Sequence, residues 1–305
     1  MITTLKDTTA QGIQNAIMAA RQSVGVASGM VFTLLVDTPA SEFDDVFDAC
    51  VEAGREHPSR IIVTTDGSAR SDRLDAELHI GDEVPGEIIA LKFHGELVDH
   101  RSSTLLPLLL PDSPVIAWWP GEAPEPLIED AVGSLAQRRI TDAMGAADPL
   151  ARLLERAEGL APGDTDLTWT RLTPWRALLA SALDTHQAPV VGATVEAAPN
   201  NAAGLLLAAW LGSRLGLDAE FVTSKGPGIT SVCLVTEDGE IVLSRGDGKM
   251  ATFTAPRTPP RSVALRRREI SALITEELRR LDTDHVFQQS MGCLASNVHR
   301  HNGEG

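Results

Sequence analysis

The chain has 305 residues and a formal net charge of −16 at pH 7, and 43% of its residues are hydrophobic. This composition is typical of a globular protein rather than a disordered or fibrous one, and the length favours two domains. Because a strongly acidic surface repels phosphate groups, neither nucleic acid nor an anionic membrane is expected as a partner.

The sequence also shows no membrane or export signal. No apolar run reaches the roughly 18 residues that a membrane-spanning helix needs. The N-terminal residues lack a basic segment followed by an apolar core, which is the pattern of a secretory signal peptide. We therefore expect a cytoplasmic protein.

The first half of the chain alternates predicted strands and helices. Continuous apolar runs at residues 30–37 and 60–67 indicate buried strands, and the amphipathic segment 41–57 indicates a helix capped by Ser41. This order implies a right-handed crossover between two parallel strands. Further strands are expected at residues 74–81, 87–96 and 113–122, and helical segments at residues 8–22, 100–112, 134–144 and 148–159. Residues 1–160 are therefore expected to form an α/β domain with a largely parallel or mixed sheet.

The second half begins after a linker at residues 159–164. Thr173 is expected to cap a helix that starts at Pro174, because the missing N–H of proline costs nothing there. Another helix is expected at residues 200–216, capped by Asn200 or Asn201. Strands are expected at residues 188–196, 218–224, 229–238, 240–248, 249–256 and 261–267, with hairpin turns at Asp238-Gly239 and Asp247-Gly248, and one or two helices at residues 269–291. Residues 165–305 are therefore expected to form a second α/β domain, mixed and with antiparallel hairpins.

The sequence contains no recognisable catalytic motif. It lacks the GxGxxG, P-loop and GxSxG patterns, and its three cysteines, Cys50, Cys233 and Cys293, stand alone without a histidine at metal-ligand spacing. We therefore predict no catalytic residue, no metal and no cofactor.

Six residues are candidates for contact with a protein partner. Trp169, Arg171, Trp175 and Arg176 lie in the segment DLTWTRLTPWRALLAS, and Trp118 and Trp119 end a predicted strand, where open α/β sheets bind ligands or partners. Trp and Arg are the side chains that most often anchor protein interfaces. The alternative is packing, with the indoles in the core and the arginines paired to carboxylates. In this alternative the segment is a structural junction.

Arginine pairs and helix starts suggest where an anion could bind. Arg138 and Arg139 could hold a carboxylate or phosphate through their paired donors, but a structural salt bridge to Asp142 is the favoured explanation. Asn200 stands at the start of a predicted helix, another site that favours anions. Five further arginines gather near the C-terminus, without the aromatic residues that stack on bases, and indicate a solvated or salt-bridged edge: Arg257, Arg261, Arg266, Arg267 and Arg268.

Several long segments resemble one known family. HPSRIIV, PLLLPDSPVIAWWPGEAP, LAQRRITDA, PGDTDLTWTRLTPWRALLAS and SKGPGITSV occur in order along the chain. Together they resemble the OpcA family of glucose-6-phosphate dehydrogenase assembly proteins from actinobacteria and cyanobacteria. The tryptophan-rich segments make this resemblance much more specific than a three-residue motif would.

The resemblance implies a non-catalytic protein of two domains. Such a protein would bind glucose-6-phosphate dehydrogenase, promote its active oligomer in the oxidative pentose phosphate pathway, and alter its response to substrate as an allosteric effector. It gives no residue-level map of the contact and names no small-molecule effector. The alternative function is a sugar-phosphate-binding sensor or enzyme built on an α/β domain.

Overall fold

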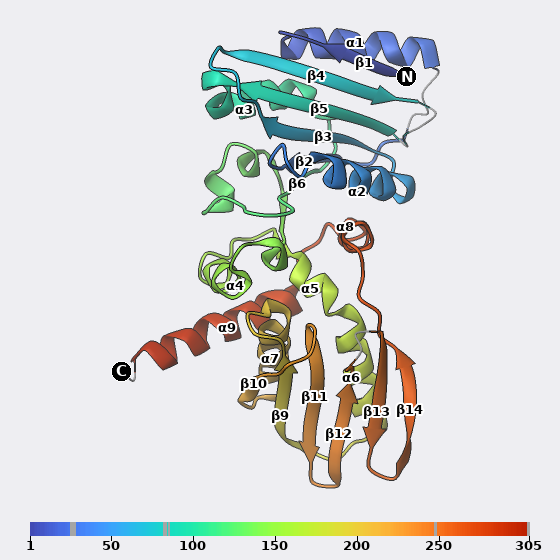
Figure 1. The fold of residues 1–305 in the computed structure, drawn as a ribbon, viewed down its shortest axis with the longest axis vertical. Coiled ribbons are helices and arrows are strands. Elements are labelled where there is room, and N and C mark those ends of the chain that lie inside the picture. The colour runs from blue at the N-terminus through green and yellow to red at the C-terminus, as the bar shows by residue number, and fades with distance from the viewer. Residues whose placement is uncertain (25–28, 82–83, 85, 247–248, 304–305) are drawn as a thin grey trace. The chain divides into compact units, whose positions relative to one another are not determined.

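A computed structural model describes the chain except residues 25–28, 82–83, 85, 247–248 and 304–305 (Figure 1). The chain forms two compact units. Unit 1 is Met1–Thr141 with Ile270–Asp282, and unit 2 is Asp142–Glu269 with Thr283–Gly305. Both units contain helices and a sheet, which confirms the predicted α/β class. The division at residues 160–165 stays a prediction from the sequence.

The sheet of unit 1 is mixed, as predicted. Its strands follow the order β1-β4-β5-β3-β2-β6-β7. The five strands β5-β3-β2-β6-β7 are parallel to one another. At the other side of β5, β4 pairs antiparallel with β5, and β1 pairs antiparallel with β4. The bounds are β1 (Ile2–Leu5), β2 (Thr33–Asp37), β3 (Ser59–Asp66), β4 (Arg73–Ile80), β5 (Gly86–His94), β6 (Val115–Trp118) and β7 (Arg138–Thr141).

Helices cover both faces of this sheet. Ile13 and Ile17 of α1 (Ala10–Val24) share one apolar cluster with Ile62 of β3. The preceding residue, Ile61, is also fully buried but lies outside that cluster, because successive strand residues point to opposite faces. The other helices of the unit are α2 (Phe43–Glu56), α3 (Arg101–Leu105) and α8 (Ile270–Glu277), and four 3-10 turns occupy Gly95–His100, Leu106–Leu108, Leu127–Glu129 and Gly133–Leu135.

Three local expectations for unit 1 were wrong. Residues 134–144 are not a helix, because residues 138–141 form β7, all four of whose residues are buried beside β6. Ser41 does not cap α2, whose N-cap position is held by Glu42 without a side-chain hydrogen bond. The short strand β1 was not predicted. Its four residues, ITTL, are exposed or partly buried, and such a short segment has too few apolar residues to show the alternation of a strand.

The sheet of unit 2 is mixed with antiparallel hairpins, as predicted. Its order is β10-β9-β11-β12-β13-β14, in which only the β10 and β9 pair is parallel. A two-residue turn at Glu237 and Asp238 joins β11 to β12, one residue before the predicted Asp238-Gly239, because Gly239 already pairs with Thr236 in the ladder. The second predicted turn, Asp247-Gly248, lies outside the described residues. The strands of this sheet are β9 (Val190–Ala197), β10 (Ala219–Thr223), β11 (Ile229–Thr236), β12 (Gly239–Ser244), β13 (Met250–Ala255) and β14 (Thr258–Ala264). The short strand β8 (Asp164–Asp166) belongs to unit 2 by its residue range but is not part of this sheet.

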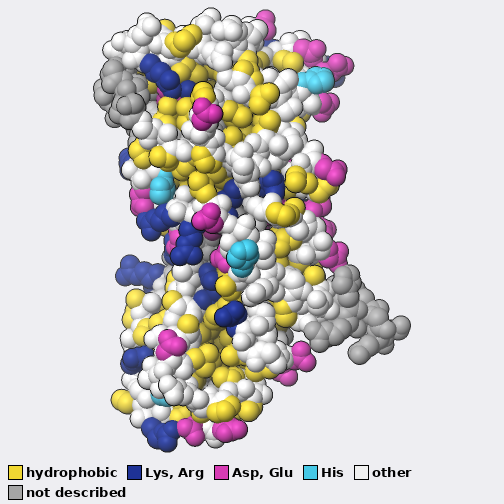
Figure 2. Space-filling model, turned by 180° about the vertical axis from the view of Figure 1, so that it is seen from behind, with side chains coloured by type: hydrophobic (Ala, Val, Ile, Leu, Met, Phe, Trp, Pro, Cys, Tyr) yellow, Lys and Arg dark blue, Asp and Glu magenta, His cyan; other side chains and the backbone are white. Residues whose placement is uncertain are grey.

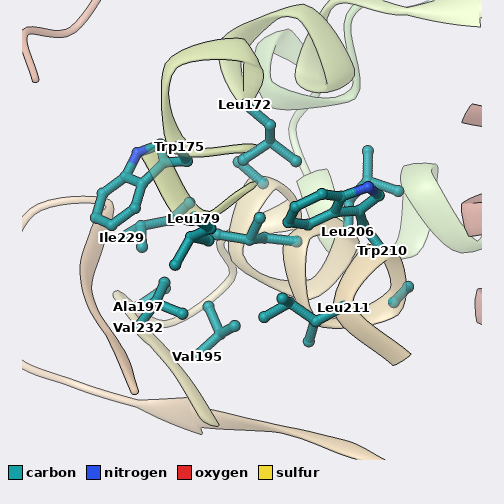
Figure 3. Packing of buried hydrophobic residues seen from close by; sticks show 14 of the residues in the cluster. Leu172, Trp175, Leu179, Val195, Ala197, Leu206, Trp210, Leu211, Ile229 and Val232 are labelled. Atoms are coloured by element: carbon teal, nitrogen blue, oxygen red, sulfur yellow. The ribbon is translucent and has the colours of Figure 1, made fainter. Parts of the chain in front are cut away.

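Two helices pack on this sheet and form the core of unit 2. Leu179 of α6 and Leu206 of α7 lie between Trp175 and Trp210, above the strand residues Val195 and Val232 (Figure 3). The helices are α4 (Pro149–Glu158), α5 (Leu167–Arg171), α6 (Thr173–Thr185), α7 (Ala202–Leu215) and α9 (His285–Gly303), and Ala143–Gly145 form a 3-10 turn.

The start of α7 is fixed by its cap and by a close approach to the sheet. The Asn201 side chain accepts a hydrogen bond of 2.8 Å from the Gly204 amide, which confirms one of the two predicted caps. A Cβ on Gly204 would lie 2.7 Å from the Ala197 Cβ of β9. Only glycine therefore lets this end of α7 lie so close to the strand.

Candidate functional site

After Asp166, the segment of residues 166–181 consists of helix α5 and most of helix α6, separated by Leu172. Asp166 caps α5 by accepting a hydrogen bond of 2.8 Å from the Thr168 amide. As predicted, the next helix, α6, has Pro174 in its first turn, but Thr173 is its first residue rather than its cap. The Thr173 hydroxyl instead accepts a bond of 3.3 Å from the Arg176 guanidinium. Two short helices in succession therefore set the positions of the tryptophans and arginines.

Trp169 joins α5 to the start of α9 within unit 2. Its ring lies 5.7 Å from the Phe287 ring, and the Arg176 guanidinium carbon lies 3.5 Å from the centre of the indole. The indole N–H donates a hydrogen bond of 2.9 Å to the Asp284 carboxylate, which also accepts the Val286 and Phe287 amides and so caps α9. Trp169 therefore makes a cation–π contact with Arg176 and also donates a hydrogen bond to Asp284, the residue that caps α9.

The charge of Asp284 depends on these same contacts. Burial raises the pKa of its carboxyl, but the Phe287 amide, the Trp169 indole and the Arg176 charge together outweigh burial and lower it. The carboxylate therefore stays ionised at neutral pH and holds the indole, the guanidinium and the helix start together.

Arg171 pairs with a buried acid. Its guanidinium donates to the Asp142 carboxylate at 2.5 Å, and Asp142 is 2% exposed. Burial raises the pKa of the Asp142 carboxyl to about 7; Arg171 lowers it only in part, and the nearby Asp166 raises it further. Asp142 thus changes charge close to neutral pH, while Arg171 keeps about a quarter of its side chain exposed.

Trp175 forms part of the wall of a cavity in unit 2. The cavity has a volume of about 320 Å³. Arg171 and Arg245 also line it, and the Arg245 guanidinium carbon lies 4.9 Å from the centre of the Trp175 ring. Arg245 is held in place by donating to the carbonyls of Leu265 at 2.9 Å and Ile229 at 3.2 Å. The arrangement presents guanidinium groups beside an aromatic face.

Trp118 and Trp119 lie in unit 1, in the core at the end of β6. They are 0% and 1% exposed. Neither indole N–H has a hydrogen-bond acceptor within the described part of the chain. A Cβ on Gly133 would lie 1.9 Å from the Leu127 carbonyl oxygen and 3.2 Å from the Trp119 ring, so glycine is needed for the close backbone approach and also leaves room for the indole. Packing accounts for the position of both tryptophans.

All four tryptophans of the predicted contact set are buried, which limits their direct contact with a partner. Each is at most 3% exposed. Arg171 and Arg176 are the partly exposed members of the predicted contact set. Contact with a partner through these six residues stays a prediction, and any direct contact in this conformation falls to the two arginines.

The three predicted anion-binding residues have other bonds in the structure. Arg138 forms a buried ion pair with Glu277 of α8 and donates to the Asp282 carbonyl at 3.0 Å. Arg139 donates to the Ala136 carbonyl at 2.9 Å. Asn200 has a left-handed backbone, with φ of 58°, and its side chain accepts the Leu150 amide at 3.2 Å. The arginines belong to unit 1 and Asn200 to unit 2, and anion binding by them stays a prediction.

The basic lining of the cavity is the feature that sequence reasoning missed. The run Arg266-Arg267-Arg268 stands out in the sequence, where it indicates only a solvated edge. Arg245 stands alone in the sequence and joins this run because its side chain, just after β12, reaches the Leu265 carbonyl just after β14. Basic side chains gather beside hydrophobic ones in the lower half of the space-filling view (Figure 2).

Two properties of the described residues bear on other functions. They contain no group of three or more His, Cys, Asp and Glu side chains placed to hold a metal ion. Within the same residues, no helix combines the length and apolar character needed to cross a membrane.

Two family models match most of the chain. Residues 50–158 match the N-terminal domain of the glucose-6-phosphate dehydrogenase subunit (OpcA_G6PD_assem), and residues 162–291 match its C-terminal domain (OpcA_G6PD_C). No curated protein matches the chain. A solved structure described as an oxidoreductase from Sinorhizobium meliloti is similar at 9% identity over 90% of both chains, with a TM-score of 0.41. At that TM-score neither its fold nor its activity is carried over to this chain.

Proposed function

Because the chain belongs to the OpcA family of glucose-6-phosphate dehydrogenase subunits, we propose that it binds this dehydrogenase as a non-catalytic assembly factor in the cytoplasm. The observation that supports the proposal is that both halves of the chain match the family's two domain models, over residues 50–158 and 162–291. The shared function of the family concerns the dehydrogenase as a partner. The sequence also lacks a recognisable catalytic motif of its own.

The proposed effect on the dehydrogenase is allosteric. A protein that favours the active oligomer must bind that oligomer more tightly than the inactive one. By the same linkage, a substrate that favours the active state strengthens binding of this chain. The chain would therefore lower the substrate concentration that half-saturates the enzyme.

We propose that Arg171 and Arg176 contact the partner directly, while the buried indoles of Trp169 and Trp175 fix their positions. Both arginines project from the two short helices of residues 167–185, and each is held by a contact of its own, to Asp142 and to the Trp169 ring respectively. Pre-positioned arginines lose little side-chain entropy on binding, which favours them as interface anchors. Trp118 and Trp119 are proposed to act by packing at the end of β6.

The test is substrate saturation of dehydrogenase that has already assembled, measured with and without this chain. The expected result is a lower half-saturating substrate concentration when the chain is present. Arg171→Ala or Arg176→Ala should raise the chain concentration needed for the effect by roughly 30-fold, the loss typical of one interface anchor. Arg214→Ala removes an exposed arginine of α7 and serves as the matched control, with no change expected. Unchanged saturation at every chain concentration would remove the allosteric role and leave a scaffold.

A second candidate function is a sensor or enzyme for a sugar phosphate. Only one observation favours it, the arginine-lined cavity of unit 2. Incubation with glucose 6-phosphate and nicotinamide cofactors in the absence of the dehydrogenase distinguishes the enzyme from the other functions. Turnover would support an enzyme, and no turnover would exclude this reaction.

A further inference from the structure

The cavity of unit 2 combines a deep apolar wall with a basic rim. Trp175, Ile229 and Leu265 are almost fully buried at its wall, whereas Arg266 and Arg267 are exposed at its edge. Its volume of about 320 Å³ is within the range of small-molecule sites. The size therefore fits a small ligand rather than a folded segment of another protein.

The charged side chains that line the cavity are all positive. Five arginines line it, and the described lining residues include no Asp or Glu. Arg266 and Arg267 have no ion pair with any residue that the structure describes. The protein as a whole carries a net charge of −16, so a local group of five guanidiniums runs against its average surface. A site of this kind attracts anions.

Gly228 brings two of these guanidiniums close together. Its backbone is left-handed, with φ of 67°, and a Cβ there would lie 3.1 Å from Arg267 Nη2 and 3.8 Å from Arg245 Nη2. The Nη2 atoms of Arg267 and Arg245 therefore lie no further apart than the sum of these two distances. Like charges at such a separation repel each other, and an anion placed between them removes the repulsion.

We propose that this cavity binds a small organic phosphate. The guanidiniums of Arg266 and Arg267 would hold the phosphate group through paired N–H donors, which match its oxygens in geometry. The Trp175 face and the side chains of Leu172 and Ile229 would cover the organic part. Binding of this ligand needs no residue of the dehydrogenase, so the site goes beyond the proposed assembly function; the two proposals share one residue, Arg171.

Titration calorimetry of the full chain alone tests this site. The probes are glucose 6-phosphate, inorganic phosphate, pyrophosphate and uncharged glucose. We expect glucose 6-phosphate to bind more tightly than inorganic phosphate, because only the ester reaches the apolar wall, and we expect no binding of glucose. The double variant Arg266→Ala/Arg267→Ala should weaken binding at least tenfold, since charge-assisted hydrogen bonds are lost. Arg214→Ala, which removes one exposed arginine outside the cavity, is the control and should bind as the unaltered chain does.

A second variant separates geometry from charge. Gly228→Ala keeps all five arginines but displaces Arg267, so it should also weaken binding while the far-UV circular dichroism stays unchanged. The proposal is overturned if glucose 6-phosphate gives no heat, or if the double arginine variant and the glycine variant both bind it as the unaltered chain does. It is also overturned if no probe binds and the double variant instead loses affinity for the dehydrogenase, because the cavity is then a protein contact. The first two results do not depend on whether the dehydrogenase assembly proposal holds, and the third applies only if the chain binds the dehydrogenase.

Discussion

Trp169→Ala is expected to lower the free energy of unfolding of unit 2 by about 3–5 kcal/mol, the usual cost of removing a buried tryptophan. Trp169 is 2% exposed and contacts Phe287, Arg176 and Asp284 at once. Its removal leaves a cavity, ends the cation–π contact and takes one donor from the Asp284 carboxylate. Chemical denaturation followed by circular dichroism measures the change.

Trp169→Phe is the matched control for that experiment. Phenylalanine keeps a ring for packing on Phe287 and for the Arg176 guanidinium, but it lacks the N–H that binds Asp284. We expect a loss of about 1–3 kcal/mol, which covers the unmade hydrogen bond and part of the ring volume. If the alanine variant loses under about 1 kcal/mol, or no more than the phenylalanine variant, Trp169 is not the junction of α5 and α9.

Asp142→Asn is expected to change the pH dependence of stability. In the folded chain the pKa of Asp142 is raised to about 7. An unfolded aspartate has a pKa of about 3.9, so between about pH 4 and pH 7 the folded state binds more protons than the unfolded state. The unaltered chain therefore loses stability as pH rises through this window, by up to about 4 kcal/mol, and then levels off. The asparagine variant lacks this loss.

The measurement is the free energy of unfolding of both proteins at intervals from about pH 4.5 to pH 7.5. The difference between them should shift progressively in favour of Asp142→Asn as pH rises. Asp238→Asn is the control, because Asp238 pairs with Arg257 on the surface, with about half of its side chain exposed. A parallel pH dependence in the unaltered chain and Asp142→Asn would mean that Asp142 is ionised throughout, as an ordinary partner of Arg171.

The sequence predicted the uniformly apolar strands of the sheet in unit 1 better than the arginine-containing strand β7. Continuous apolar runs marked β2, β3 and β6, because strands covered on both faces have no polar positions. The sequence indicates a helix at residues 138–141, because buried arginines look like solvent-exposed ones in a sequence. Arg138 is buried in an ion pair with Glu277, which lies far along the chain in α8 of the same unit.

The candidate site shows the same limit. Residue type predicted that Trp169, Trp175 and the nearby arginines act together, but it could not tell a buried indole from an exposed one. Asp284 caps α9 and also accepts the Trp169 N–H, and no local pattern links residues so far apart. The cavity was beyond prediction for a similar reason. Arg171 comes from α5 and the other four arginines from the loops that follow β12 and β14, and Gly228 is a local sign of the close approach.

Light scattering on the separated species tests most directly whether this chain assembles glucose-6-phosphate dehydrogenase. The dehydrogenase, this chain and their mixture are each passed over a sizing column, and the mass of every peak is measured. We expect the mixture to give a peak heavier than the dehydrogenase alone that contains both chains, together with a larger share of the dehydrogenase in its active oligomer. Two separate peaks with the masses of the individual proteins, and an unchanged oligomer distribution, would contradict the proposed function.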